Sequence, residues 1–254
     1  MKAKVILAAA AGTVFIAAGL LAAILLNRAD FPEYYALKEF FFEGDFDKFR
    51  ADMFNWYKAA QREDGVMLAE TEYYGTDILD DWKSGGVYKN VPEDGFWYFA
   101  VSPSYLEEIG LRPLDGSIDE AWDGVRLYLL SNTLNERAAE ELKAFLTEDA
   151  LKAAGYGGIE NGFAQRHEIA FLEYAPDKYY TWRSETALPA FDDAPVFYVC
   201  TTENMTSFES ESLIATGVDG YIKFKNENVL GRFKDEPLFK NYGLKFAKTS
   251  EIYK

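Results

Sequence analysis

Cysteine and histidine are almost absent from the chain, which has one of each, Cys200 and His167, in 254 residues. A single cysteine cannot form an intrachain disulfide, and its apolar setting at residues 196–200 predicts a buried, inert thiol. Zinc sites draw on several cysteine or histidine ligands, so no zinc site is expected. A Ser-His-Asp site would have to use His167, but no Gly-x-Ser-x-Gly motif accompanies it, and a histidine at a strand edge is favoured. We therefore predict no catalytic residue, no metal and no cofactor.

Basic residues are also scarce, with 26 Lys and Arg against 42 Asp and Glu, which gives a formal net charge of −16. A surface this acidic repels phosphate backbones and anionic head groups, so nucleic acid is excluded as a partner. Cations, basic peptides and neutral ligands remain possible binding partners. The acidic loop at residues 115–123 lacks the glycine and the final glutamate that an EF-hand requires, so it does not predict a calcium site.

One long stretch lacks charge altogether, the 22 residues from Val5 to Leu26. As a helix it would be roughly 33 Å long, which is enough to cross the hydrocarbon core of a bilayer. A secretory signal is the alternative, but signal cores are shorter, about 7 to 15 residues, and end at a small-x-small site. An uncleaved anchor is favoured. The basic residues Lys2 and Lys4 precede it, so we predict a single-pass protein of the cell membrane with a cytoplasmic N-terminus and an extracytoplasmic bulk.

The chain after the anchor alternates strand-like and helix-like patterns. Residues 34–42 predict a buried strand, and apolar positions from Phe46 to Ala60 recur at helical spacing after a turn and N-cap at Asp45. Residues 66–74 and 95–101 predict two more strands, separated by a polar loop at residues 75–94. This order of strand, helix, strand, strand makes up the first predicted unit.

A second unit has a similar order. Residues 125–130 predict a strand, and Thr133 and Glu136 are spaced as a capping box before a helix that ends near Gly155. Further strands are predicted at 168–174, 194–201, 220–225 and 244–253. The expected class is α+β: a cytoplasmic tip and transmembrane helix over residues 1–27, then a mixed α/β ectodomain, which could be two βαβ-like halves at 28–110 and 111–254.

Four segments carry a resemblance to a known family: VSPSYLEEIG at 101–110, GVRLYL at 124–129, residues 203–224, and FAKTSEIY at 246–253. They resemble the extracytoplasmic domain of bacteriocin-associated integral membrane proteins, a family similar to FtsX-like and macrolide-exporter-type ABC permeases. The resemblance implies an external domain that follows one transmembrane helix and precedes three more. The sequence has no later apolar span, so transport by this chain alone is not expected.

Three functions follow as hypotheses. The resemblance implies a non-catalytic external domain of an ABC-exporter-type permease, engaged in export of, or immunity to, a bacteriocin or other antimicrobial peptide. Its implied partners are an ABC ATPase and further transmembrane segments or a further subunit. The alternative is a single-span, membrane-tethered module that binds a peptide or a glycan. An anchored hydrolase built on His167 is the third reading.

Two groups of residues are candidate contact sites. The polar run at residues 203–217 predicts an ordered segment that contacts a partner or the other half-domain, and its candidates are Glu203, Asn204, Met205, Phe208, Glu209 and Glu211. A capped turn in which Asn204 and Ser207 satisfy backbone donors is the competing interpretation. Aromatic residues make up 17% of the chain, and a ligand cleft lined by Trp97, Tyr98, Tyr180 and Trp182 is the second candidate. Since neighbouring residues of a strand face opposite sides, some of these rings must belong to the core.

Overall fold

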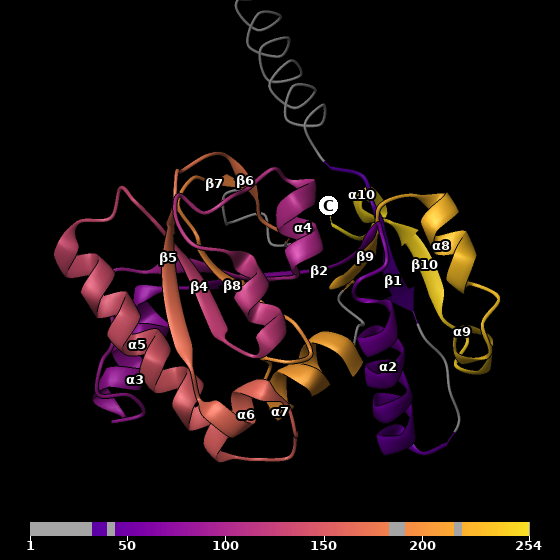
Figure 1. Ribbon diagram of the computed structural model, residues 1–254, viewed down its shortest axis with the longest axis horizontal. Helices are drawn as coiled ribbons and strands as arrows, with labels where there is room; N and C mark the ends of the chain where they lie inside the picture. The colour runs from indigo at the N-terminus through magenta and orange to yellow at the C-terminus, as the bar shows by residue number, and fades with distance from the viewer. Residues whose placement is uncertain (1–31, 40–43, 183–190, 216–219, 254) are drawn as a thin grey trace, which may run out of the picture. The chain divides into compact units, whose positions relative to one another are not determined.

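An eight-stranded mixed sheet organises the chain (Figure 1). The structure is a computed structural model that describes residues 32–39, 44–182, 191–215 and 220–253. The strands of this sheet are β1 Tyr35–Glu39, β2 Val66–Tyr74, β3 Phe96–Val101, β4 Arg126–Ser131, β5 Ile169–Tyr174, β8 Val196–Val199, β9 Ile222–Phe224 and β10 Lys245–Lys248. A separate two-stranded sheet pairs β6 Tyr179–Tyr180 with β7 Phe191–Asp192. The predicted α+β class is confirmed as a mixed α+β fold.

Helices of differing length connect these strands. They are α2 Phe46–Ala60, α3 Thr76–Ser84, α4 Pro103–Glu108, α5 Glu136–Gly155, α6 Gly162–Arg166, α7 Ser207–Glu209, α8 Glu227–Phe233, α9 Pro237–Asn241 and α10 Thr249–Ile252, with a 3₁₀ turn η1 at Ile118–Asp123 and a π-helical turn η2 at Ser210–Ala215. The predicted anchor at residues 5–26 lies outside the described residues. Within the described residues no helix is long and apolar enough to span a membrane.

Local sequence accounts for the first helix and the strand after it. The Asp45 carboxylate accepts hydrogen bonds from the backbone N–H groups of Asp47 and Lys48, which caps α2 as predicted. The buried residues of α2 recur at three- and four-residue intervals along one face. Gly65, at a φ of +79°, then turns the chain into β2, and both elements have the predicted bounds.

Three local predictions were wrong. The strand predicted at residues 244–253 ends at Lys248, where its pairing with the start of β1 ends, and α10 occupies residues 249–252. Residues 75–94 are not a loop throughout, because α3 occupies residues 76–84; Leu79 is buried and Trp82 stacks on Phe145 of α5. In the sequence, this helix was indicated by apolar residues spaced three apart inside a polar stretch. The capping box at Thr133 is also absent: Asn135 caps α5 by accepting from the backbone N–H of Ala138, and the Thr133 hydroxyl pairs with that of Ser131.

The strand order is β10-β1-β9-β2-β3-β8-β4-β5. Both β1 and β2 are antiparallel to β9, so they are parallel to each other, with α2 between them in sequence and β9 between them in space. Likewise β9 and β10 are parallel and flank β1. The order β10-β1-β9-β2 is thus the interlocked pair of split βαβ units found in ferredoxin-like folds.

The remaining strands form an insertion between β2 and β9. Within it β4 and β5 pair in parallel and are joined through α5, which makes a βαβ unit. Strand β3 pairs with β2 on one side and with β8 on the other. The boundary predicted at residue 110 therefore falls within one continuous sheet that takes strands from both sides of it, and residues 33–254 form one compact unit.

The sheet has two covered faces. One, here called the helical face, packs against α2, α5, α8 and α9 and contains alternate strand residues such as Leu68, Ala100, Tyr128, Tyr198 and Phe224. The other face meets α4, α10 and the β6-β7 hairpin through a cluster of rings: Trp182 donates to the Tyr105 hydroxyl and packs on Tyr253, and Tyr179 packs on Phe197. The candidate site lies on the helical face.

Candidate functional site

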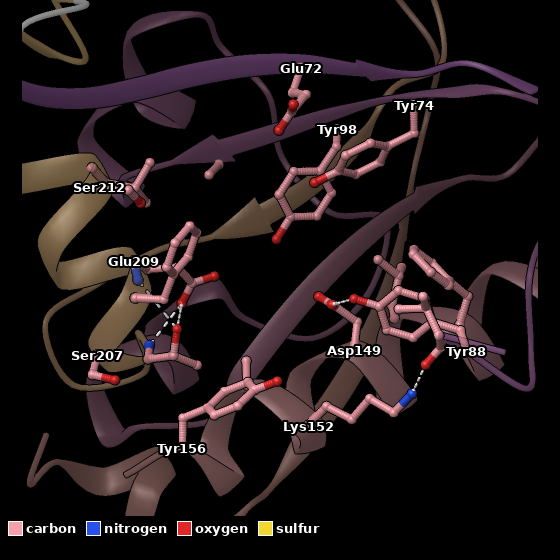
Figure 2. Close-up of a pocket in the computed structure, with 18 of the residues that line it drawn as sticks. Glu72, Tyr74, Tyr88, Tyr98, Asp149, Lys152, Tyr156, Ser207, Glu209 and Ser212 are labelled. Carbon is pink, nitrogen blue, oxygen red and sulfur yellow. Dashed lines mark hydrogen bonds between the residues drawn. The ribbon is translucent and has the colours of Figure 1, made fainter. Parts of the chain in front are cut away.

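A cavity of about 1140 Å³ lies on the helical face. Its floor is formed by β2 and β3, and its walls by α3, α5 and the α7-η2 segment (Figure 2). Figure 1 shows α7 between α5 and α2, where the chain crosses from β8 to β9. The cavity is therefore bounded by parts of the chain that lie far apart in sequence.

Carboxylates lie on the floor because β2 changes character along its length. Val66, Leu68, Glu70, Glu72 and Tyr74 share one face of the strand by its two-residue period. The first two belong to the hydrophobic core, whereas the last three line the cavity. Burial raises the pKa of Glu70 to about 7, from an ordinary value of 4.5, and the charge of Glu72 adds to that shift.

Aromatic rings cover one side of the cavity. Tyr74 contacts Trp82, Phe96 and Tyr98 with ring centroids 5.3 to 5.8 Å apart. Phe145 of α5 extends the group by packing against Trp82 at 5.9 Å. Burial raises the pKa of the Tyr74 and Tyr98 hydroxyls well above the ordinary value, so both stay protonated at neutral pH. In Figure 2 the Tyr74 and Tyr98 rings both point into the cavity.

Helix α5 brings charged groups to the opposite wall. The Tyr88 hydroxyl donates to the Asp149 carboxylate at 2.7 Å. Burial raises the pKa of Asp149, against the hydrogen bond from Tyr88, which lowers it. Lys152 pairs with Glu148 at 2.9 Å, donates to the backbone carbonyl of Val87, and lies 4.4 Å from the centre of the Tyr88 ring. The one lysine of this cavity therefore already has partners.

The α7-η2 wall is fixed by an ion pair. The Arg126 guanidinium, on β4, is 1% exposed and donates two hydrogen bonds to the Glu209 carboxylate, at 2.6 and 2.7 Å. It also lies 4.0 Å from the centre of the Tyr198 ring. Glu209 accepts in addition from the backbone N–H and hydroxyl of Thr206, which completes a capping box on α7. Burial acts to raise the pKa of Glu209, but Arg126 and Thr206 hold it below its ordinary value.

The remaining candidates of the 203–217 segment divide into buried and surface residues. Asn204 and Met205 are fully buried; the Asn204 amide donates to the carbonyls of Val125 and Val199. Glu203 pairs with Lys58 at 3.2 Å and Glu211 with Arg50 at 2.7 Å, both on α2, whereas Phe208 is 71% exposed. The segment thus contacts α2 and β4 within this chain, and contact with another protein stays a prediction.

The proposed capped turn is seen in part. The Asn204 side-chain oxygen accepts from the backbone N–H of Thr201 at 2.8 Å. The residue that caps α7 is Thr206, not Ser207. In the sequence, the Thr-x-x-Glu spacing from Thr206 to Glu209 indicated this capping box.

The four aromatic candidates do not line one cleft. Tyr98 lines the cavity, but its neighbour Trp97 faces the opposite side of the sheet, where it is buried against Tyr73 and Phe99. Tyr180 and Trp182 pack on each other at 4.8 Å outside the cavity lining.

Sequence reasoning missed Glu70, Asp149 and Trp82. A usable signal for Glu70 was its place in the period of β2, on the face of Leu68. Asp149 gave no comparable signal, since α5 carries many acidic residues.

The cavity offers carboxylates and aromatic rings to a ligand. No group of three Asp, Glu, His or Cys side chains in the described ranges is placed to hold a metal ion. His167 is exposed at the end of α6, in the left-handed conformation at a φ of +53°, and Cys200 is fully buried; neither lines the cavity. Carboxylates beside aromatic rings favour cationic groups.

Comparison of the chain with family models, with curated proteins and with solved structures found no match.

Proposed function

We propose that residues 33–254 are the ligand-contacting extracytoplasmic domain of an ABC-exporter-type permease, held at the membrane by the segment at residues 5–26. The observation that carries the ligand-contacting role is the cavity, because it is large and its lining sets the carboxylates of Glu70, Glu72 and Asp149 beside aromatic rings. The proposed partners are an ABC ATPase and further transmembrane segments.

The ends of the domain support a place between membrane spans. Strand β1, at the start, pairs with β10, near the end. The backbone N–H of Tyr34 donates to the Thr249 hydroxyl at 3.0 Å, and Glu33 pairs with Lys248 at 2.6 Å. An external domain that leaves and re-enters one membrane needs adjacent ends, although many single domains also have them.

The predicted division of the ectodomain into two βαβ-like halves is part of the same proposal. Units β1-α2-β2 and β4-α5-β5 are each a strand, a helix and a strand parallel to the first. An N-terminal anchor followed by these two strand-helix-strand units, joined in one sheet, is the arrangement that we propose.

Topology in the membrane is tested by labelling introduced cysteines with a membrane-impermeant maleimide in intact cells. Cys200 is 0% exposed, so background labelling of this native cysteine should be low. Lys83→Cys, on the exposed end of α3, should react in intact cells, whereas Lys2→Cys should react only after the cells are opened. Reaction at both positions only in opened cells would contradict an extracytoplasmic domain.

Assembly is tested by purifying the tagged full chain from its native membranes and identifying what accompanies it. Recovery of an ATPase and a polytopic membrane protein in fixed proportion supports the permease. Recovery of the chain by itself supports the second candidate, a tethered binding module, which the carboxylates and exposed rings of the cavity favour.

A further inference from the structure

Exposed apolar side chains gather at the cavity. Eight large hydrophobic residues of the described chain are exposed, and four of them line this cavity: Ile78, Val87, Tyr156 and Phe208. Tyr156 is 86% exposed and Phe208 71% exposed. Apolar groups gathered around a hollow, on a surface that is otherwise strongly acidic, are typical of an interaction site.

The interior of the cavity carries an excess of negative charge. Glu70, Glu72, Asp149, Glu209 and Glu211 all line it. Arg126 neutralises Glu209, and Arg50 neutralises Glu211. In the described part of the chain no basic side chain forms an ion pair with Glu70 or Asp149.

We propose that the cavity binds a cationic amphipathic peptide, whose amine or guanidinium groups lie at Glu70 and Asp149 and whose apolar side chains lie on Tyr156 and Phe208. This inference rests on the proposed function, since it takes the cavity as the ligand-contacting site. The two kinds of lining match the two faces of one ligand: carboxylates pair with its cations, and the exposed rings remove its apolar groups from water.

The rings between the carboxylates suit the same ligand. Tyr74 and Tyr98 lie between Glu72 and Asp149 in Figure 2. A cation over an aromatic face is attracted by the ring, and Lys152 already occupies such a position over Tyr88, 4.4 Å from the ring centre. A metal ion fits less well, because no three ligating side chains of the described residues converge on one point.

Binding of a cationic peptide should also release a proton from the Glu70 carboxyl. Glu70 is faced by Glu72 on its own strand, Glu209 from α7, Lys223 from β9, and the Tyr221 hydroxyl, which donates to it. With these neighbours and its burial, the pKa of Glu70 is about 7 in the empty cavity. A bound cation favours the ionised carboxylate, so binding expels the proton and should strengthen as the pH rises towards about 7.

The test uses the full chain in a mild detergent and fluorescence anisotropy with short labelled peptides. The probe is an amphipathic peptide of lysine and leucine; its controls are a glutamate-leucine peptide of the same pattern and an oligolysine without leucine. The variant Glu70→Gln/Asp149→Asn removes the two acidic contacts. The matched control Glu227→Gln/Glu251→Gln removes two exposed carboxylates outside the cavity.

The lysine-leucine peptide should bind the wild type and bind Glu70→Gln/Asp149→Asn about 30-fold more weakly, as expected for loss of buried charge partners. Glu227→Gln/Glu251→Gln should retain wild-type affinity. Tyr156→Ser/Phe208→Ser should weaken the amphipathic peptide but not oligolysine. Glu70→Gln alone should remove the proton release, measured as the change of affinity between about pH 5 and about pH 8.

Equal weakening by both carboxylate pairs would show only general attraction to an acidic protein and would overturn the inference. Tight binding of the glutamate-leucine peptide would do the same. Failure of the proposed function is separable, because a tethered module purified without an ATPase can still bind the peptide. Conversely, an assembled permease whose domain ignores the peptide would refute only the ligand class.

Discussion

Replacing Glu70 by glutamine should stabilise the protein at alkaline pH. Glu70 is partly buried on the floor of the cavity, and its pKa is raised from 4.5 to about 7. In the unfolded chain the carboxyl ionises near its ordinary value, so between these two values the folded state binds the proton more tightly. Stability from this group is therefore present at acid pH and is lost as the pH rises from 4.5 to about 7.

The size of the effect follows from the shift. At about 1.36 kcal/mol for each pKa unit, the shift corresponds to a penalty of ~3 kcal/mol above pH 7. Glutamine keeps the shape and can still accept a hydrogen bond from Tyr221, which donates to Glu70. Glu70→Gln should thus raise the free energy of unfolding by up to ~3 kcal/mol at about pH 8 and change it little at about pH 4.

Urea denaturation of the full chain in detergent, followed by tryptophan fluorescence, measures this free energy. All five tryptophans lie at or after residue 56, so the signal reports on the described domain. Glu227→Gln, an exposed substitution of the same chemistry, is the control and should stay within ~0.5 kcal/mol of the wild type at either pH. A Glu70→Gln variant that is destabilised at alkaline pH, or equally stabilised at both values, would refute the reasoning.

Three further predictions concern the walls of the cavity and the core behind them. Arg126→Met should lower the free energy of unfolding by ~3 to 5 kcal/mol, because it leaves the Glu209 carboxylate without its buried partner. Adding Glu209→Gln should recover part of the loss. An unchanged urea midpoint for the single variant would contradict the predicted loss. Asn204→Ala should lower the free energy of unfolding by ~3 kcal/mol, because four hydrogen bonds of a fully buried amide are lost. Phe208→Ala in the same segment should change it by no more than ~0.5 kcal/mol. Similar losses for both variants in a denaturant titration would argue against the assigned contacts. The Cys200 thiol, whose pKa is raised by burial, should resist an aromatic disulfide reagent in the native protein and react in urea; fast native labelling would show that the site opens.

Stability and ligand binding are opposed at Glu70. The carboxylate weakens the fold at neutral pH and above, yet it is a group that the proposed cationic ligand requires. Natural proteins keep such unfavourable groups mainly where function needs them. A Glu70→Gln variant that is more stable and binds the lysine-leucine peptide less tightly would show both effects in one protein.

The local elements that were predicted correctly have patterns contained within a few residues. Helix α2 and strand β2 are examples, since an N-cap, a 3.6-residue period and a two-residue period are all visible without tertiary contacts. Helix α3 was missed because its apolar residues are few, and it is held by the ring of Trp82 stacking on Phe145 of a distant helix. The predicted aromatic cleft failed for a related reason: Trp97 and Tyr98 are adjacent in sequence but lie on opposite faces of β3.

The sequence by itself determined the α+β class, most strand positions, the buried state of Cys200, and ordered structure in the segment that begins at Glu203, which the structure describes as far as residue 215. Only the tertiary structure decided that β9 lies between β1 and β2, and that Glu70 and Asp149 line one cavity. The reason is physical: strand and helix formation follow from short-range periodicity, whereas strand order and the cavity depend on which distant segments bury the most apolar surface together.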